Sequence, residues 1–290
     1  MPRDVSADRV LVVGEALVDV VEDQALPGGS PLNVAVGLQR LGVPATLHSS
    51  FGADQHGVAI AQHLEASGVT VTPGTVSDRD TPVAQATIGP DGAASYAFSI
   101  DWDPGPFDTT GYALVHTGSI GAALEPGASE VERALAATDA LVSFDPNVRP
   151  ALMGDHAAAV ARVERFVALA DIVKASDEDV EWLYPDGGVT EILERWAALG
   201  PRLVVVTRGA DGAEAFAAGE TVHVPAFVTT LVDTIGAGDS FMAGLLAAVL
   251  RNGFDDVRGA VTYAARCAGI TVSRPGADPP TADEVAATTL

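Results

Sequence analysis

Four apolar runs decide the fold: Tyr112–Thr117 (YALVHT), Leu141–Asp145 (LVSFD), Ile172–Ala175 (IVKA) and Leu203–Thr207 (LVVVT). They are short and rich in β-branched residues, and longer stretches of helical character separate them. Buried parallel strands have this composition, because helices cover both faces of their sheet. The alternation predicts a doubly wound α/β fold whose mainly parallel sheet is flanked by helices.

The same rhythm extends toward the N-terminus. We predict, in chain order, a strand at Arg9–Val13, a helix at Leu32–Leu41 ended by Gly42, a strand at Ala45–Phe51, and a helix at Gly57–Ser67 ended by Gly68. For a chain of 290 residues this pattern suits a single α/β domain over residues 1–290.

Two predicted hairpins interrupt the alternation. Val83–Ile88 and Ala93–Ile100 flank the turn segment Gly89-Pro90-Asp91-Gly92, and a second hairpin is predicted within Gly212–Val224. The first hairpin could form a lid, an oligomer contact or only a surface feature, and the pattern alone favours none of these.

The composition restricts what the protein binds. The chain has 39 Asp and Glu against 16 Lys and Arg, a net charge of −23, which repels nucleic acid and anionic lipid. The same field repels ATP, so a nucleotide site would need backbone N–H donors, local cations and a divalent metal. Cys267 is the only cysteine, which excludes an internal disulfide. No run is long enough for a membrane span or an export signal, so we expect a cytoplasmic protein.

The strongest chemical signal is Asp233-Thr234-Ile235-Gly236-Ala237-Gly238-Asp239, which precedes an apolar helix at Ser240–Leu250. Small residues allow a tight turn, and a helix N-terminus adds partial positive charge, so the segment predicts an anion hole for a phosphoryl group. The carboxylate of Asp239 could take the proton from an attacking hydroxyl beside that anion. Helix capping alone would explain Asp239 but not the three small residues before it.

Other candidate residues are weaker on their own. Gly28-Gly29-Ser30-Pro31-Leu32-Asn33 suits either a plain helix entry or close backbone approach to a ligand whose hydroxyls Asn33 binds. Asp19 is either a second hydroxyl ligand or a solvated loop acid. Polar residues also follow predicted strands, where open sheets bind ligands: Gly14-Glu15, Asp145-Pro146-Asn147, Lys174 and Thr207-Arg208-Gly209. Lys174 is the only lysine, and a cation there could reach phosphates.

Several common sites are missing from the sequence. A Walker A loop cannot be written around Lys174, no G-x-G-x-x-G follows a predicted strand, and no G-x-S-x-G occurs. His48, His56 and His63 lack the H-E-x-x-H spacing, so we interpret them as surface or packing residues.

Taken together, these segments resemble the ribokinase-like (PfkB) family of carbohydrate kinases. Residues 233–239 are similar to the family's C-terminal D-T-x-G-A-G-D signature, and residues 28–35 to its N-terminal signature. Residues 51–54, 207–212 and 274–277 fall in the family's order, so the resemblance covers nearly the whole chain. It implies a ribokinase-like fold with a small β lid, which we place within residues 14–30 and 83–103. It also implies ATP-dependent phosphorylation of a sugar's primary hydroxyl.

The resemblance also implies roles for individual residues. Asp239 would be the general base, and the N–H groups of Gly236, Ala237 and Gly238 would hold the transferring phosphoryl group. The sugar would contact Asp19, Gly29, Asn33, Arg149 and Asp239. The nucleotide would lie along Lys174, Thr207, Gly209, Gly212 and Gly238. The implied cofactors are ATP and Mg²⁺, with Asp179 in the outer shell of the magnesium. A monovalent cation, commonly potassium, would lie near Asp233, Thr234 and Ser273.

Residues 145–149 (DPNVR) narrow the choice of acceptor sugar. They are similar to the D-P-N-x-R segment of fructokinases, to which the chain is closest, and of 2-keto-3-deoxygluconate kinases. Fructose, converted to fructose 6-phosphate, is therefore the first choice, and ketodeoxygluconate is the second. A ribokinase or nucleoside kinase, and a non-catalytic sugar-sensing protein on the same fold, stay open as alternatives.

The chain departs from the family pattern at three points. Only eight residues separate Asp19 from Gly28, which predicts a reduced lid and leaves a homodimer formed through that lid open. Residues 92–96 lack the charged pair that many fructokinases carry. Residues 176–179 (SDED) stand where relatives have N-x-x-E or S-x-x-E, so the shorter Asp179, or Glu178 in its place, would reach the magnesium.

Overall fold

The main sheet confirms the predicted mainly parallel α/β fold. The structure is a computed structural model that describes residues 8–21, 24–88, 94–227 and 230–288. The strand order is β15-β14-β13-β12-β11-β10-β1-β4-β6, parallel from β13 to β6, with β14 and β15 antiparallel at one edge. The strands are β1 (Val10–Val13), β4 (Ala45–His48), β6 (Thr70–Val71), β10 (Leu114–Gly118), β11 (Leu141–Asp145), β12 (Ile172–Ser176), β13 (Leu203–Thr207), β14 (Ala213–Ala217) and β15 (Glu220–Val224).

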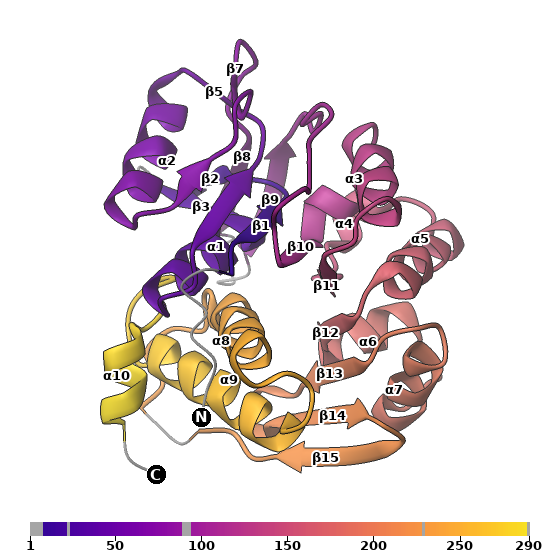
Figure 1. Cartoon of the computed structure of the whole chain (residues 1–290). Helices are drawn as coiled ribbons and strands as arrows, with labels where there is room; N and C mark the ends of the chain where they lie inside the picture. Colours follow the sequence, from indigo (N-terminus) through magenta and orange to yellow (C-terminus); the bar gives the residue numbers. More distant parts are fainter. Residues whose placement is uncertain (1–7, 22–23, 89–93, 228–229, 289–290) are drawn as a thin grey trace.

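Helices cover both faces of this sheet, because successive strand residues point to opposite sides. In β1, Val10 and Val12 join one apolar cluster and Leu11 and Val13 the other, and all four are fully buried. The first cluster includes residues of α1 (Ser30–Arg40), α2 (Gln55–Ala66), α8 (Ala237–Asn252), α9 (Val257–Val272) and α10 (Ala282–Ala287). The second includes α3 (Gly127–Ala136), α4 (Pro150–Met153), α5 (His156–Leu169), α6 (Asp177–Leu183) and α7 (Val189–Ala197) (Figure 1).

A second sheet lies at the indigo and purple end of the molecule in Figure 1, next to α2. Its strand order is β3-β2-β8-β9, built from β2 (Leu17–Val21), β3 (Gln24–Gly28), β8 (Val83–Ile88) and β9 (Ala94–Ser99). β2 pairs antiparallel with β3 and parallel with β8. The short interval between Asp19 and Gly28 therefore still forms a two-stranded ribbon. A small third cluster, with Leu17, Ala84 and Ile120 at its centre, joins this sheet to the turn after β10.

Most predicted elements occur with shifted ends. The predicted strand Ala45–Phe51 is wrong as one element: β4 ends at His48, and β5 (Phe51–Gly52) pairs with β7 (Val76–Ser77) in a separate small sheet. The break arises because the amide of Ser49 turns to the hydroxyl of Thr75, 3.3 Å away. α2 begins earlier than predicted, because Asp54 caps it by accepting from the amide of Gly57.

Both predicted hairpins are confirmed. β8 pairs antiparallel with β9, and β14 pairs antiparallel with β15. The predicted turn Gly89-Pro90-Asp91-Gly92 lies outside the described residues. Within the residues described, we find no helix both long and apolar enough to span a bilayer.

Candidate active site

The glycine-rich segment before α8 is held in one conformation. Gly236 precedes the helix with φ +73°, and a Cβ on it would lie 2.6 Å from the Cβ of Ala277. A side chain is thus excluded by both backbone conformation and space. Asp233 fixes the segment from the other side: its carboxylate accepts from the amides of Ile235 (3.0 Å) and Gly276 (2.8 Å).

The predicted helix begins at Ala237 rather than Ser240, so the small residues form its first turn. The N–H groups of a first turn have no acceptor inside their own helix, which leaves a concentration of partial positive charge there. The amide of Ala237 donates to the carbonyl of Thr234 (3.2 Å). Of the three predicted anion-hole amides, that of Ala237 therefore has a protein acceptor in this structure.

The two signature segments, which lie more than 190 residues apart in sequence, meet at the carboxylate of Asp239. Oδ1 accepts from the hydroxyl of Ser30 (2.6 Å), and Oδ2 accepts from the side-chain amide of Asn33 (2.9 Å). Both donors come from the first turn of α1, which packs against α8. Asp239 is 8% exposed. Its carboxylate is thus oriented by two neutral donors rather than by an ion pair.

Lys174 lies beneath the glycine-rich turn. A Cβ on Gly238 would lie 3.0 Å from its Nζ, and Nζ donates to Asp145 Oδ2 at 2.9 Å. Both members of this ion pair are buried. Burial opposes the charged ammonium, but the carboxylates of Asp145, Asp179 and Asp239 raise the pKa of Lys174. Burial raises the pKa of Asp145 to about 6, against the opposing effect of Lys174.

Asp179 supports residues 145–149, the segment that narrows the choice of acceptor sugar. Its Oδ1 accepts from the amide of Val148 (2.7 Å), and its Oδ2 accepts from the amide of Ser176 (2.8 Å). The second bond closes a capping box at the start of α6. The residue for which we predict a place in the outer shell of magnesium therefore has both oxygens on backbone amides, where it fixes the loop after β11.

The predicted sugar ligands come from several elements: Asp19 from β2, Gly29 and Asn33 from the start of α1, Arg149 from the loop before α4, and Asp239 from α8. Asp19 lies on β2, not in a loop, and its Oδ2 would be 2.4 Å from a Cβ on Gly28. Burial raises the pKa of Asp19, and the charge of Arg149 partly offsets this. Gly29 also has no room for a side chain, since a Cβ there would lie 2.7 Å from the carbonyl oxygen of Glu15.

The predicted nucleotide residues lie at the ends of neighbouring strands. Thr207 ends β13 and donates its hydroxyl to the carbonyl of Ala175 (3.3 Å). Gly209 begins the short helix after β13 and Gly212 follows it, with φ +50° and +86°. Among the predicted cation residues, Ser273 ends α9 and donates its hydroxyl to the carbonyl of Ile270 (2.6 Å), while Thr234 is exposed.

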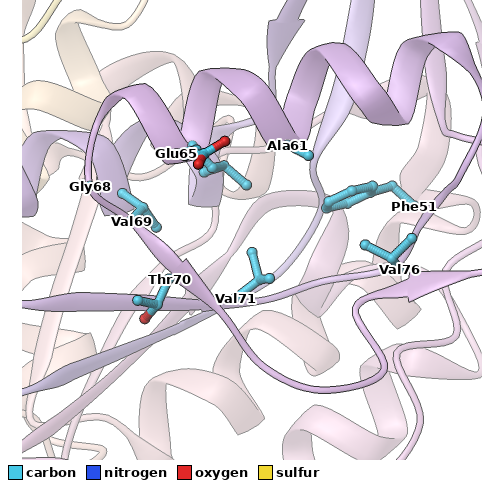
Figure 2. A pocket seen from close by; sticks show the side chains of 9 residues that line it. Phe51, Ala61, Glu65, Gly68, Val69, Thr70, Val71 and Val76 are labelled. Carbon is cyan, nitrogen blue, oxygen red and sulfur yellow. The ribbon is translucent and has the colours of Figure 1, made fainter.

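No metal-binding cluster is found among the described residues, and the groove in Figure 2 lies away from this site. The described residues hold no group of three or more His, Cys, Asp or Glu side chains that could bind a metal ion. His48 packs on Phe107, and burial lowers its pKa to about 4.

A groove of about 310 Å³ lies elsewhere, between α2 and the strands that follow it (Figure 2). It is lined by Phe51, Ala61, Leu64, Glu65, Gly68, Val69, Thr70, Val71 and Val76. It contains none of the predicted site residues.

Sequence reasoning gave no role to Ser30 or Glu15. Ser30 lies inside the quoted N-terminal signature, but its bond to Asp239 depends on how α1 packs on α8. The sequence marks Glu15 only by its position after a predicted strand. Burial raises its pKa to about 7, against hydrogen bonds from Ser119 and from the amide of Gly121. Burial of an acid cannot be read from its position in the sequence.

A carboxylate beside a helix N-terminus, with a buried lysine under the turn, is an arrangement that suits phosphoryl transfer. The model of the pfkB family of carbohydrate kinases matches residues 4–284, and the chain belongs to this family. It is therefore a sugar kinase.

Named relatives cover most of the chain. It is 34% identical over 259 residues to a fructokinase of Rhizobium leguminosarum bv. trifolii, covering 83% of this chain and 79% of that protein. A fructokinase of Vibrio cholerae O395, solved with fructose, ADP and a calcium ion, superposes with a TM-score of 0.83 at 29% identity, covering 94% and 95%. An aminoimidazole riboside kinase from Salmonella enterica, complexed with aminoimidazole riboside and an ATP analogue, gives a TM-score of 0.83 at 26% identity, covering 96% and 99%.

Proposed function

We propose that this kinase transfers the γ-phosphoryl group of ATP to the primary hydroxyl of D-fructose, giving fructose 6-phosphate and ADP. The observation that carries the proposal is the carboxylate of Asp239, oriented by Ser30 and Asn33 in the first turn of α8. The similarity to fructokinases, one of them solved with fructose and ADP, supports the choice of acceptor.

In the proposed reaction Asp239 accepts the proton of the sugar hydroxyl as its oxygen attacks the γ-phosphorus. The new oxygen–phosphorus bond forms as the bond from that phosphorus to the β,γ-bridging oxygen breaks, and ADP leaves. This reaction depends more on positioning than on strong basicity. Ser30 and Asn33 provide positioning, because their two bonds fix both carboxylate oxygens.

Charge on the transferring phosphoryl group would be stabilised by the N–H groups of Gly236 and Gly238 and by the dipole of α8. The amide of Ala237 would join them after leaving the carbonyl of Thr234. Lys174 would add its charge from beneath Gly238. In a protein of net charge −23, a buried cation at this point offsets the repulsion of the nucleotide.

We assign the sugar to Asp19, Gly29, Asn33 and Arg149, and the nucleotide to Lys174, Thr207, Gly209, Gly212 and Gly238. These residues fit Mg²⁺ carried by the phosphates of ATP, which needs few protein ligands. When bound, Mg²⁺ would neutralise phosphate charge. Both carboxylate oxygens of Asp179 accept from backbone amides, so Asp179 could act on Mg²⁺ only through water. Potassium near Asp233, Thr234 and Ser273, and a homodimer through the second sheet as lid, are separate proposals.

Two other acceptors are worth testing. The similarity to a structure with bound aminoimidazole riboside favours a riboside as the second candidate. Arg149, whose charge acts on Asp19, would suit the carboxylate of ketodeoxygluconate. A non-catalytic sensor is disfavoured, because a binding-only protein has no need to orient Asp239 through two donors.

An acceptor screen tests the proposal. ADP release is measured with fructose, ribose, ketodeoxygluconate, adenosine and aminoimidazole riboside, with and without potassium, and Asp239→Asn is the control for background ATP hydrolysis. We expect fructose to have the highest kcat/KM. A higher value for another acceptor would replace fructose. No turnover with any of them, alongside measurable sugar binding, would favour the sensor.

A further inference from the structure

Glu15 is a buried acid that the proposed reaction does not use. It comes directly after Gly14, which follows β1, at the carboxyl ends of the strands, where the site lies. Glu15 is 1% exposed. Its Oε2 accepts from the amide of Gly121 at 3.0 Å, and it also takes a hydrogen bond from the side chain of Ser119. The carboxylate therefore ties the turn after β10 to the end of β1.

The turn that Glu15 holds is tightly packed and conformationally unusual. Ser119 has φ +51°, a conformation rare for residues other than glycine. A Cβ on Gly121 would lie 2.7 Å from the Cα of Gly14, and the carbonyl of Gly121 accepts from the indole of Trp102 at 2.9 Å. Unusual backbone of this kind persists only where the surroundings enforce it, and it clusters at functional sites.

Glu15 also lies directly behind Gly29, one of the residues assigned to the sugar. Its carbonyl oxygen is what a Cβ on Gly29 would meet, and its Cγ would be 3.4 Å from the same atom. The charge of Arg149 acts on Glu15 and on Asp19 alike. A substitution at Glu15 would therefore affect Gly29 through direct contact and Arg149 through a change of charge.

We propose that Glu15 is a positioning residue for the acceptor sugar: its carboxylate clamps the turn after β10 behind Gly29 and adds negative charge that acts on Arg149. The inference rests on the proposed function. It assigns Glu15 to sugar binding and leaves phosphoryl transfer to Asp239.

The protonation state of Glu15 links the proposed role to pH. Burial raises its pKa to about 7, so near neutral pH the carboxylate loses or gains a proton. The groups that face it are the hydroxyl of Ser119 and the amide of Gly121. The charge of Arg149 also acts on it, while the guanidinium of Arg149 donates to Asn147 and to the carbonyl of Val148. Asp19 shares the charge of Arg149, and the side chain of Asp145, beside the same turn, pairs with Lys174. Protonation weakens the hold on Arg149, so the KM for the sugar should rise as pH falls below about 7.

Glu15→Gln tests the proposal, because it keeps the shape and an acceptor for Gly121 but removes the charge. KM and kcat are measured for fructose at saturating ATP, and for ATP at saturating fructose, from pH 6 to 8.5. Losing a charge-assisted contact predicts a rise of about tenfold in the KM for fructose at pH 8. The KM for ATP should change less than about twofold, and the KM for fructose should no longer depend on pH in this range. Glu132→Gln on α3, whose carboxylate pairs with Arg165 on α5, is the matched control and should keep the wild-type KM values and pH profile.

Three outcomes are informative. An unchanged KM for fructose, or an unchanged pH profile, would overturn the role of Glu15 while wild-type turnover left the proposed function intact. Parallel losses for both substrates together with a lower melting temperature at pH 8 would identify a structural residue and also overturn it. Wild type without turnover on any acceptor would remove the proposed function and this inference with it.

Discussion

Replacing Lys174 with Met should destabilise the protein strongly, and more at high pH than at low pH. The ammonium lies 2.9 Å from Asp145, and their side chains are 5% and 1% exposed. Removing one member of a buried pair typically costs about 3–5 kcal/mol, because the remaining charge has lost its partner. We expect a loss of that size in the free energy of unfolding at pH 8.

The pH dependence follows from Asp145. Its pKa is raised to about 6 by burial even with Lys174 present, so at pH 5 the carboxyl group is largely protonated and needs no counter-charge. Without Lys174 its pKa would be higher still. The destabilisation by Lys174→Met should therefore fall to half or less at pH 5.

Urea unfolding at pH 5 and pH 8 measures both effects. Arg165→Met is the matched control: Arg165 also pairs with a carboxylate at 2.9 Å, but the pair is exposed, so it should cost about 0–1 kcal/mol. The double variant with Asp145→Asn should recover part of the loss at pH 8. Equal losses at the two pH values, or a loss no larger than that of the control, would refute the reasoning.

Three further predictions concern the site. Gly236→Ala should cost roughly 1–3 kcal/mol in unfolding free energy and reduce kcat, because φ +73° and the Cβ of Ala277 exclude a side chain; an unchanged melting temperature and kcat would count against it. Asp19→Ala should raise chiefly the KM for fructose, and an unchanged KM would remove Asp19 from the site. The difference in unfolding free energy between Glu15→Gln and wild type should shift by about 2–3 kcal/mol in favour of the variant as the pH rises from 5 to 8. The folded-state pKa of about 7 lies above the ordinary value of 4.5, so wild type loses stability as pH rises through 7. Parallel pH–stability curves for the two proteins would disprove this last prediction.

The sheet could be predicted from the sequence because its strands are short, apolar and separated by helices. β11 and β13 have the predicted bounds. The split of the strand after Pro44 could not be predicted, since it depends on Thr75, which is distant in sequence. The four-stranded sheet around Asp19 could not be predicted from that segment alone, because β2 finds its second partner in β8, which is distant in sequence.

At the site, the residues could be predicted better than their contacts. The sequence indicates Asp239 and Asn33 but not that one donates to the other, because the bond follows from the packing of α1 on α8. Lys174 was predicted to reach phosphates, and the structure adds its buried pair with Asp145. The roles of Asp179 and Glu15 depend on burial and backbone partners, which no spacing rule supplies.

The most direct test of the account is the turnover number of Asp239→Asn with fructose and ATP. Asparagine keeps the size of the side chain but cannot accept the proton, so kcat should fall by roughly 10²–10⁴-fold, the usual contribution of a general base. The KM for fructose should change little. Wild-type kcat in this variant would contradict the assignment of Asp239 as the base.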